Sequence, residues 1–158
     1  MPVFYMICGI PMSGKSSIAK KISKTENAVI FSFDKIKREL HNGDIYYPNY
    51  NKETLLTIQS RVGDALKKRE NVVIDAVNKN KFERKRYIKQ AKNRGYYTVC
   101  VYCKKDYDYA IHENRMRDET KKIPEDILKQ ACDSFTPPDE KEGWDEIRII
   151  YKNMNPKI

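Results

Sequence analysis

Short apolar runs alternate with amphipathic segments along this chain of 158 residues. Five runs are predicted to be buried strands, because each is short and largely apolar; they cover residues 3–8, 28–33, 72–75, 96–103 and 146–151. Helical spacing, or a proline or glycine at a boundary, predicts helices from residue 15, over 34–40, 54–69, 81–94 and 106–117, and from Pro124. Strands separated by helices predict an α/β fold, with a five-stranded, mainly parallel sheet and helices on both faces. The length fits a single domain over residues 1–158.

The strongest chemical signal lies between the first predicted strand and the helix after it. Gly9-Ile-Pro-Met-Ser-Gly14-Lys15-Ser16 matches the phosphate-loop pattern G-x-x-x-x-G-K-[ST] in full. The glycines allow a tight turn that presents backbone N–H groups to a phosphate, and the helix N-terminus adds its positive dipole end. Lys15 would place an ammonium on the β- and γ-phosphates, and Ser16 would offer a hydroxyl to Mg²⁺. The chain is therefore predicted to be a P-loop protein that binds a nucleoside triphosphate with Mg²⁺.

Two aspartates follow predicted strands. Asp34 ends Phe31-Ser-Phe-Asp, and Asp75 ends Val72-Val-Ile-Asp. Ligands of open α/β sheets bind outside the carboxyl ends of the strands. Asp34 could therefore accept the proton of an attacking hydroxyl, and Asp75 could lie near Mg²⁺ or its water shell. Aspartate also caps helices and strand ends, so a plain capping role stays open for both residues.

Two arginines end a predicted helix. Arg115 and Arg117 stand in His112-Glu-Asn-Arg-Met-Arg, directly before the polar segment 118–122. An arginine on a mobile segment can close over the phosphates and stabilise charge in the transition state. We therefore predict a small helical lid over residues 112–126, with a solvated basic helix face as the alternative.

Composition restricts the class of protein further. Hydrophobic residues make up 40% of the chain and charged residues 34%, the balance of a soluble globular protein. No apolar run approaches the roughly 18–20 residues of a membrane helix, and the N-terminus lacks the features of a signal peptide, so we expect a cytoplasmic protein without a membrane partner. Cys100 and Cys103 lie in a predicted strand, where residues three apart face opposite ways, which favours packed thiols over a zinc site.

The net charge is +9, from 31 basic and 22 acidic residues. A solvated lysine-rich surface and an electrostatic footprint for a polyanion such as nucleic acid both fit this value. Basic residues gather in one predicted helix and the turn before it, at Lys79, Lys81, Arg84, Lys85, Arg86 and Lys89. Three tyrosines, Tyr46, Tyr47 and Tyr50, stand in a predicted loop that could stack on bases or simply pack.

With these residues placed, the chain resembles the small kinases related to the kinase domain of phage polynucleotide 5′-hydroxyl kinase, in the adenylate-kinase-like branch of P-loop proteins. The resemblance covers about residues 5–150. It rests on G-x-P-x-S-G-K-S at 9–16, an aspartate followed by basic residues at 34–38, Asp-Ala-x-Asn at 75–78 and Asn-x-x-Arg at 114–117. Phe135-Thr-Pro-Pro and Glu142-Gly-Trp-Asp-Glu, before the last strand, also fit.

On the donor side, the resemblance implies that the phosphate loop holds ATP and Mg²⁺. The loop residues concerned are Gly9, Pro11, Ser13, Gly14, Lys15, Ser16 and Ser17. Arg117 would be the lid arginine over the donor phosphates, with Arg115 as a second candidate. Glu113 departs from the family pattern, because an arginine usually stands at this position.

On the acceptor side, the resemblance implies that Asp34 is the general base. A basic residue three positions later would contact a phosphate of the acceptor. This position is Lys37, where the family typically has arginine, and the neighbouring Arg38 could take the role. Asp75 and Asn78 would support the site near the acceptor and the metal.

The leading hypothesis is transfer of the ATP γ-phosphate to an acceptor hydroxyl, the first choice being the 5′-hydroxyl of an RNA or DNA end. One alternative is a kinase of the same fold for nucleosides, sugars or other metabolites. Another is a slow ATPase that acts through a partner. Some relatives carry fused phosphatase or ligase domains, and any such partner is expected to be separate from this chain.

Overall fold

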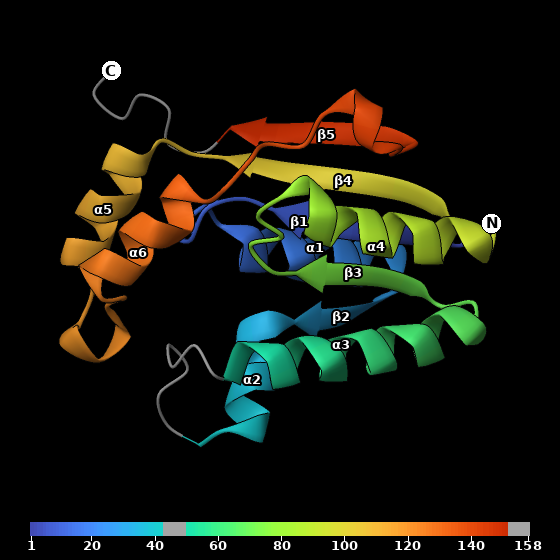
Figure 1. Ribbon diagram of the computed structural model, residues 1–158, viewed down its shortest axis with the longest axis horizontal. Coiled ribbons are helices and arrows are strands. Elements are labelled where there is room, and N and C mark those ends of the chain that lie inside the picture. The colour runs from blue at the N-terminus through green and yellow to red at the C-terminus, as the bar shows by residue number, and fades with distance from the viewer. Residues whose placement is uncertain (43–49, 152–158) are drawn as a thin grey trace.

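The computed structural model of the protein describes residues 1–42 and 50–151 (Figure 1). Five strands form one parallel sheet in the order β2-β3-β1-β4-β5. They are β1 (Val3–Cys8), β2 (Ala28–Ser32), β3 (Asn71–Asp75), β4 (Tyr97–Lys104) and β5 (Glu146–Tyr151). The predicted five-stranded parallel sheet is therefore confirmed, and its first strand lies at the centre.

Helices cover both faces of the sheet, as predicted (Figure 1). α1 (Lys15–Glu26) packs on one face, and α3 (Tyr50–Lys67) and α4 (Lys81–Asn93) pack on the other. α2 (Phe33–Leu40) follows β2, while α5 (Tyr107–Arg115) and α6 (Glu125–Asp133) lie beyond the carboxyl ends of the strands. Two short 3-10 turns, η1 (Glu119–Lys121) and η2 (Glu140–Glu142), complete the described helices. None of the helices in the described ranges is long and apolar enough to span a membrane.

Alternate residues of the buried strands supply two separate cores. Phe4 of β1 packs into the core beneath α3 and α4, and its neighbour Tyr5 packs into the core beneath α1. Cys100 and Cys103 divide between the same two cores as free, buried thiols. The prediction of packed thiols on opposite faces of a strand is therefore confirmed.

Two helix boundaries in the structure differ from the predicted ones. α3 begins at Tyr50, four residues earlier than predicted, and the Tyr50 ring stacks on His41 with 3.7 Å between ring centroids. α5 ends at Arg115, so Arg117 lies outside it. The buried Asn114 side chain bonds both the carbonyl and the N–H of Ile123, at 2.7 and 2.9 Å, which closes the intervening loop against α5.

Two further predictions concern residues near these boundaries. Pro124 immediately precedes α6 instead of being its first residue, because its ψ of 131° is extended and not helical. Tyr46 and Tyr47 lie outside the described residues, so only Tyr50 of the three tyrosines can be placed.

Strand register aligns the ends of the three strands that carry the predicted site. Ser32 at the end of β2 pairs with Asp75 at the end of β3, and Asp75 pairs with Ile7 of β1. The phosphate loop, Asp75 and Asp34 consequently start from one edge of the sheet. This is the edge at which open α/β folds bind ligands.

Candidate active site

The phosphate loop, residues 9–16, connects β1 to α1. Gly9 has no room for a side chain, because an added Cβ would lie 2.6 Å from the Cys103 carbonyl oxygen and 2.7 Å from Ser13 Oγ. Gly14 (φ 85°) leads into α1, whose first turn holds no acidic residue and no side-chain cap. The Ser13 hydroxyl is buried and has no hydrogen-bond partner among the described residues. Uncapped helix N–H groups and an unpaired buried hydroxyl fit an anionic ligand such as a phosphate.

Lys15 is the first residue of α1, and its ammonium donates to the carbonyl oxygen of Ile10 at 2.8 Å. Burial lowers the pKa of Lys15, although the charges of Asp75 and Asp34 act in the opposite direction. The influence of both carboxylates places them in the electrostatic neighbourhood of Lys15. A poorly hydrated ammonium gains from contact with a phosphate, since that contact replaces its lost hydration.

Asp75 and Ser16 form the pair of oxygen donors predicted for Mg²⁺. The Ser16 hydroxyl donates to the Asp75 carboxylate at 2.8 Å. Burial raises the pKa of Asp75, against the lowering effects of the Ser16 hydrogen bond and of Lys15. Mg²⁺ is usually bound by one or two carboxylates together with substrate phosphates and water. This pair fits such a site, and the described ranges contain no cluster of three His, Cys, Asp or Glu side chains that could hold a metal.

Asp34 lies in the first turn of α2 with its side chain exposed to solvent. The N-cap of α2 is Ser32, whose hydroxyl accepts a bond from the Lys35 N–H at 3.4 Å. A plain N-cap role for Asp34 is thus excluded. Its charge raises the pKa of Asp75 and that of Lys15, so it lies in the electrostatic neighbourhood of both residues.

The two basic residues proposed for the acceptor differ in exposure. Lys37 is 3% exposed, and its ammonium donates to Asn51 of α3 at 2.6 Å and lies 5.9 Å from the Phe33 ring centroid. Arg38 is exposed, and no interaction of its side chain is seen among the described residues. Lys37 is therefore held in place between α2 and α3, whereas Arg38 remains adaptable.

The two arginines of the predicted lid also differ in their contacts. Arg117 reaches the phosphate loop, with its Nη1 3.2 Å from the Met12 sulfur. Arg115 instead forms a two-bond pair with Glu125 of α6, both bonds at 2.9 Å, and both partners are largely exposed. Of the two, only Arg117 contacts the loop that is predicted to hold the nucleotide.

The match to known protein families adds an independent observation. A family model described as "Chromatin associated protein KTI12" matches residues 1–155. The chain belongs to the KTI12 family. This agrees with the predicted P-loop kinase class, and it does not point to phage polynucleotide kinase in particular.

Individual relatives of this KTI12-family chain include kinases and an RNA repair complex. L-seryl-tRNA(Sec) kinase of Methanococcus maripaludis is 23% identical over 145 residues, which are 89% of this chain and 55% of that protein. The chain thus spans about half the length of this curated relative. The crystal structure of Chaetomium thermophilum Kti12 in complex with ADP-AlF3 matches with a TM-score of 0.70 at 14% identity, covering 96% of this chain and 90% of that one. The Pnkp1/Rnl/Hen1 RNA repair complex matches with a TM-score of 0.71 at 21% identity, over 84% of this chain and 43% of that one. At these identities the solved structures establish the fold.

The KTI12-family chain also places a buried lysine at the loop that its sequence pattern did not single out. Lys105 follows β4, and its ammonium donates to the Met12 carbonyl at 2.6 Å and pairs with Glu113 of α5 at 2.7 Å. Met12 has a left-handed φ of 74°, so Lys105 fixes the carbonyl of a strained loop residue. Glu113, which stands where the polynucleotide kinase pattern has arginine, thereby links α5 to the phosphate loop. Its position could have identified Lys105 from the sequence, because this residue directly follows a strand at the ligand-binding edge.

Asn78 and Arg84 hold the turn after Asp75. The Asn78 amide donates to the Ile7 carbonyl at 2.8 Å, and the Asn78 carbonyl accepts from Arg84 at 2.8 Å. Arg84 also forms a two-bond pair with Glu142, at 2.8 and 2.9 Å, and its side chain is fully buried. Burial opposes ionisation of Glu142, yet hydrogen bonds from Arg84 and Trp144 outweigh it and lower the Glu142 pKa. Of the basic run noted in this helix and the turn before it, Arg84 is therefore a buried member that cannot contact a polyanion at the surface.

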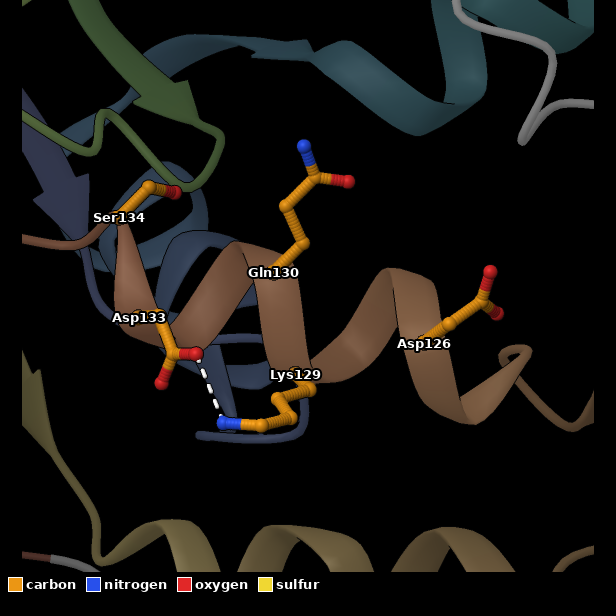
Figure 2. Close-up of a pocket in the computed structure, with 5 residues that line it drawn as sticks. All are labelled: Asp126, Lys129, Gln130, Asp133 and Ser134. Carbon is orange, nitrogen blue, oxygen red and sulfur yellow. Dashed lines mark hydrogen bonds and ion pairs between the residues drawn. The ribbon is translucent and has the colours of Figure 1, made fainter.

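A surface cavity of about 450 Å³ lies on α6 (Figure 2). Its lining residues are Asp126, Lys129, Gln130, Asp133 and Ser134. Gln130 projects on the side away from the Lys129–Asp133 ion pair (Figure 2). Burial and Asp133 raise the pKa of Cys132, and Lys15 opposes them, so α6 lies in the electrostatic neighbourhood of the phosphate loop. None of the predicted site residues lines this cavity.

Proposed function

We propose that this protein is an ATP-dependent kinase that transfers the γ-phosphate to a hydroxyl carried by a nucleic acid, with the 5′-hydroxyl of an RNA or DNA end as the first choice. The observation that carries the proposal is the placement of Asp34. It is exposed, is freed from the capping role by Ser32, and shares its surroundings with Lys15 and Asp75. A nucleotide switch has no need of a carboxylate at this position, whereas transfer to an acceptor does.

Each group would then have one task. The loop N–H groups, Ser13 and Lys15 would bind the donor phosphates, and Ser16 with Asp75 would hold Mg²⁺. When bound, the metal would neutralise charge on the phosphates. Asp34 would take the proton of the acceptor hydroxyl as its oxygen bonds to the γ-phosphorus and the bond to ADP breaks. Arg117 would stabilise the charge on the transferred group.

Two observations support an acceptor that carries its own phosphates. Lys37 is buried beside Asp34 on α2, one turn further along, and is oriented by Asn51. Arg38 adds an exposed guanidinium, which can grip a phosphate with two bonds. The Pnkp1/Rnl/Hen1 neighbour is an RNA repair complex, which supports a nucleic-acid end as the acceptor. Any phosphatase or ligase partner would be a separate protein.

A second candidate acceptor is a hydroxyl on an amino acid attached to tRNA. The observation that favours it is the match to L-seryl-tRNA(Sec) kinase over 89% of this chain. The same Asp34 would then accept the proton of a seryl hydroxyl, and the tRNA would still supply phosphates to Lys37 or Arg38.

The test is to follow label from γ-labelled ATP with Mg²⁺. Oligonucleotides with 5′-hydroxyl ends, seryl-tRNA, nucleosides and sugars are offered side by side. We expect label on a nucleic-acid substrate. In Asp34→Asn the rate of transfer should fall by about 10²-fold or more, while ATP binding is retained. Arg117→Ala should lose activity, while the control Arg115→Ala should keep it. Label on a sugar or nucleoside alone, or release of free phosphate alone, would contradict the nucleic-acid acceptor.

A further inference from the structure

The excess positive charge of the chain is concentrated in one surface helix. Residues 79–94 contain eight basic residues and one acidic residue, which is most of the net charge of +9. They comprise α4 and its two ends. Charge concentrated in this way differs from the evenly dispersed lysines of a merely solvated surface.

α4 separates its residues sharply between an inner and an outer face. Arg84, Tyr87, Ile88 and Ala91 are buried against the sheet. The outer face, together with the turn before it, carries Lys79, Phe82, Lys85, Arg86 and Lys89, all exposed. We call these five residues the α4 outer face.

Among the described residues, no carboxylate forms an ion pair with any of the four basic side chains of the α4 outer face. Neighbouring basic residues do have partners, since Lys81 pairs with Asp139 and Lys92 pairs with Asp145. Three cations on one helix face and a fourth in the turn before it, without such partners in the part of the chain that the structure describes, attract a polyanion. Each one that contacts a phosphate releases a counterion.

Phe82 adds a feature that bulk charge does not explain. Its side chain is 76% exposed in the first turn of α4. An exposed aromatic ring among cations is the arrangement with which proteins stack unpaired bases of single-stranded nucleic acid. A membrane surface fits less well, because one apolar residue offers too little area for insertion among lipid headgroups.

The position of α4 connects this face with the candidate site. The helix begins six residues after Asp75, and Arg84 ties it to the turn at Asn78. Figure 1 shows α4 on the outer layer, starting at the loop after β3 and running away from the edge that carries the site. A nucleic-acid strand bound along α4 would therefore extend from the candidate site away from this edge of the sheet.

We propose that the α4 outer face binds a single-stranded segment of the nucleic-acid acceptor, with one base stacked on Phe82 and the backbone phosphates on its basic side chains. This inference rests on the proposed function, because it gives the acceptor of the candidate site a second contact surface.

Binding is measured without transfer, so that the two proposals are tested separately. Fluorescence anisotropy follows labelled single-stranded RNA and DNA of one sequence, both ending in a 5′-phosphate, in the absence of ATP. The variant Lys85→Gln/Lys89→Gln is compared with Lys21→Gln/Lys24→Gln, which removes two exposed lysines from α1 on the opposite face of the sheet. The slope of log affinity against log salt should fall by about 1.4 in the α4 variant, at about 0.7 for each phosphate that a lysine no longer neutralises. An equal change in both variants would overturn the proposal.

A separate series of variants tests the stacking of a base on Phe82. Phe82→Ala should weaken binding about tenfold, or about 1.4 kcal/mol, and Phe82→Tyr should restore it, because a base stacks on any aromatic ring. Phe82→Leu should behave like Phe82→Ala. Wild-type affinity in Phe82→Leu would contradict stacking. Since the ring is exposed, none of these changes should alter thermal unfolding.

The combined results distinguish failure of this surface from failure of the proposed function. Label on an oligonucleotide end with wild-type kcat/KM in every α4 variant would overturn the surface and leave the function intact. Binding that depends on α4 while label goes only to a small molecule would support the surface and overturn the proposed acceptor. Binding to vesicles of anionic phospholipid in place of oligonucleotides would overturn the surface as a nucleic-acid site.

Discussion

Two groups of buried polar residues at the carboxyl edge of the sheet differ in whether the protein itself satisfies them. Around the phosphate loop, the Ser13 hydroxyl has no partner among the described residues, and burial shifts the pKa values of Lys15 and Asp75 toward their neutral forms. Beyond the turn after Asp75, the side chains of Arg84 and Glu142 are 0% and 3% exposed and hold each other with two hydrogen bonds. Burial opposes charge in both groups, but hydrogen bonds and charges within the chain outweigh it for Arg84 and Glu142 and not for Lys15 and Asp75. The first group is arranged for a ligand, and the second holds the shape of the site.

The largest expected effect is loss of activity in Lys15→Met. Removing this ammonium should abolish phosphate transfer, because no other described residue occupies its position in the loop. It should leave the free energy of unfolding equal to or above that of the wild type, since a poorly hydrated charge is removed. Transfer assays and urea unfolding measure the two results. Full activity, or a strongly destabilised protein, would contradict the comparison.

The second largest effect is loss of stability in Glu142→Gln. The change leaves Arg84 buried without its counterion, and breaking a buried pair costs about 3–5 kcal/mol. Glu125→Gln is the matched control, because its pair with Arg115 has the same two-bond geometry but is exposed. The control should cost far less, because water screens an exposed ion pair. Equal losses in urea unfolding would show that burial does not distinguish the two pairs.

Predictability from sequence follows the same division. The sheet, the phosphate loop and the edge position of Asp34 and Asp75 were predictable, because each depends on a local pattern and on the rule that parallel strands share a carboxyl edge. The pairing of Arg84 with Glu142 was not, since it joins residues 58 positions apart. The sequence places Arg84 in a basic helix, but only its contact with Glu142 of η2 shows that it lies on the buried face of that helix.

The third prediction concerns Lys105, which belongs to both groups because it pairs inside the protein yet contacts the phosphate loop. Lys105→Met should raise the KM for ATP by roughly tenfold, in line with loss of one charged hydrogen bond of about 1.5 kcal/mol, and should change kcat less. Lys105→Arg should restore much of the affinity, and Glu113→Gln should show a smaller effect in the same direction. A uniform loss of folded protein, with unchanged KM in the folded fraction, would assign Lys105 a purely structural role.

The smallest expected effect is a difference in pH dependence between the two groups. The pKa of Glu142 is lowered in the folded state, so its contribution to stability is present above its ordinary pKa and is lost as pH falls through the lower, folded value. The pKa of Asp75 is raised, so ionising it destabilises the folded state as pH rises from the ordinary value through the raised one. Glu142→Gln should therefore flatten the acid side of the stability curve.

Asp75→Asn should act in the opposite sense. It should remove the cost of ionising Asp75, so the variant becomes more stable than the wild type above the pH window and matches it below. Urea unfolding over a series of pH values, without nucleotide or metal, measures both curves. Asp75→Asn also removes a carboxylate from the proposed Mg²⁺ site, so the same protein should bind ATP with Mg²⁺ more weakly. A variant that is more stable but binds less would show that the polar groups around the loop are held at a cost in stability for their ligand.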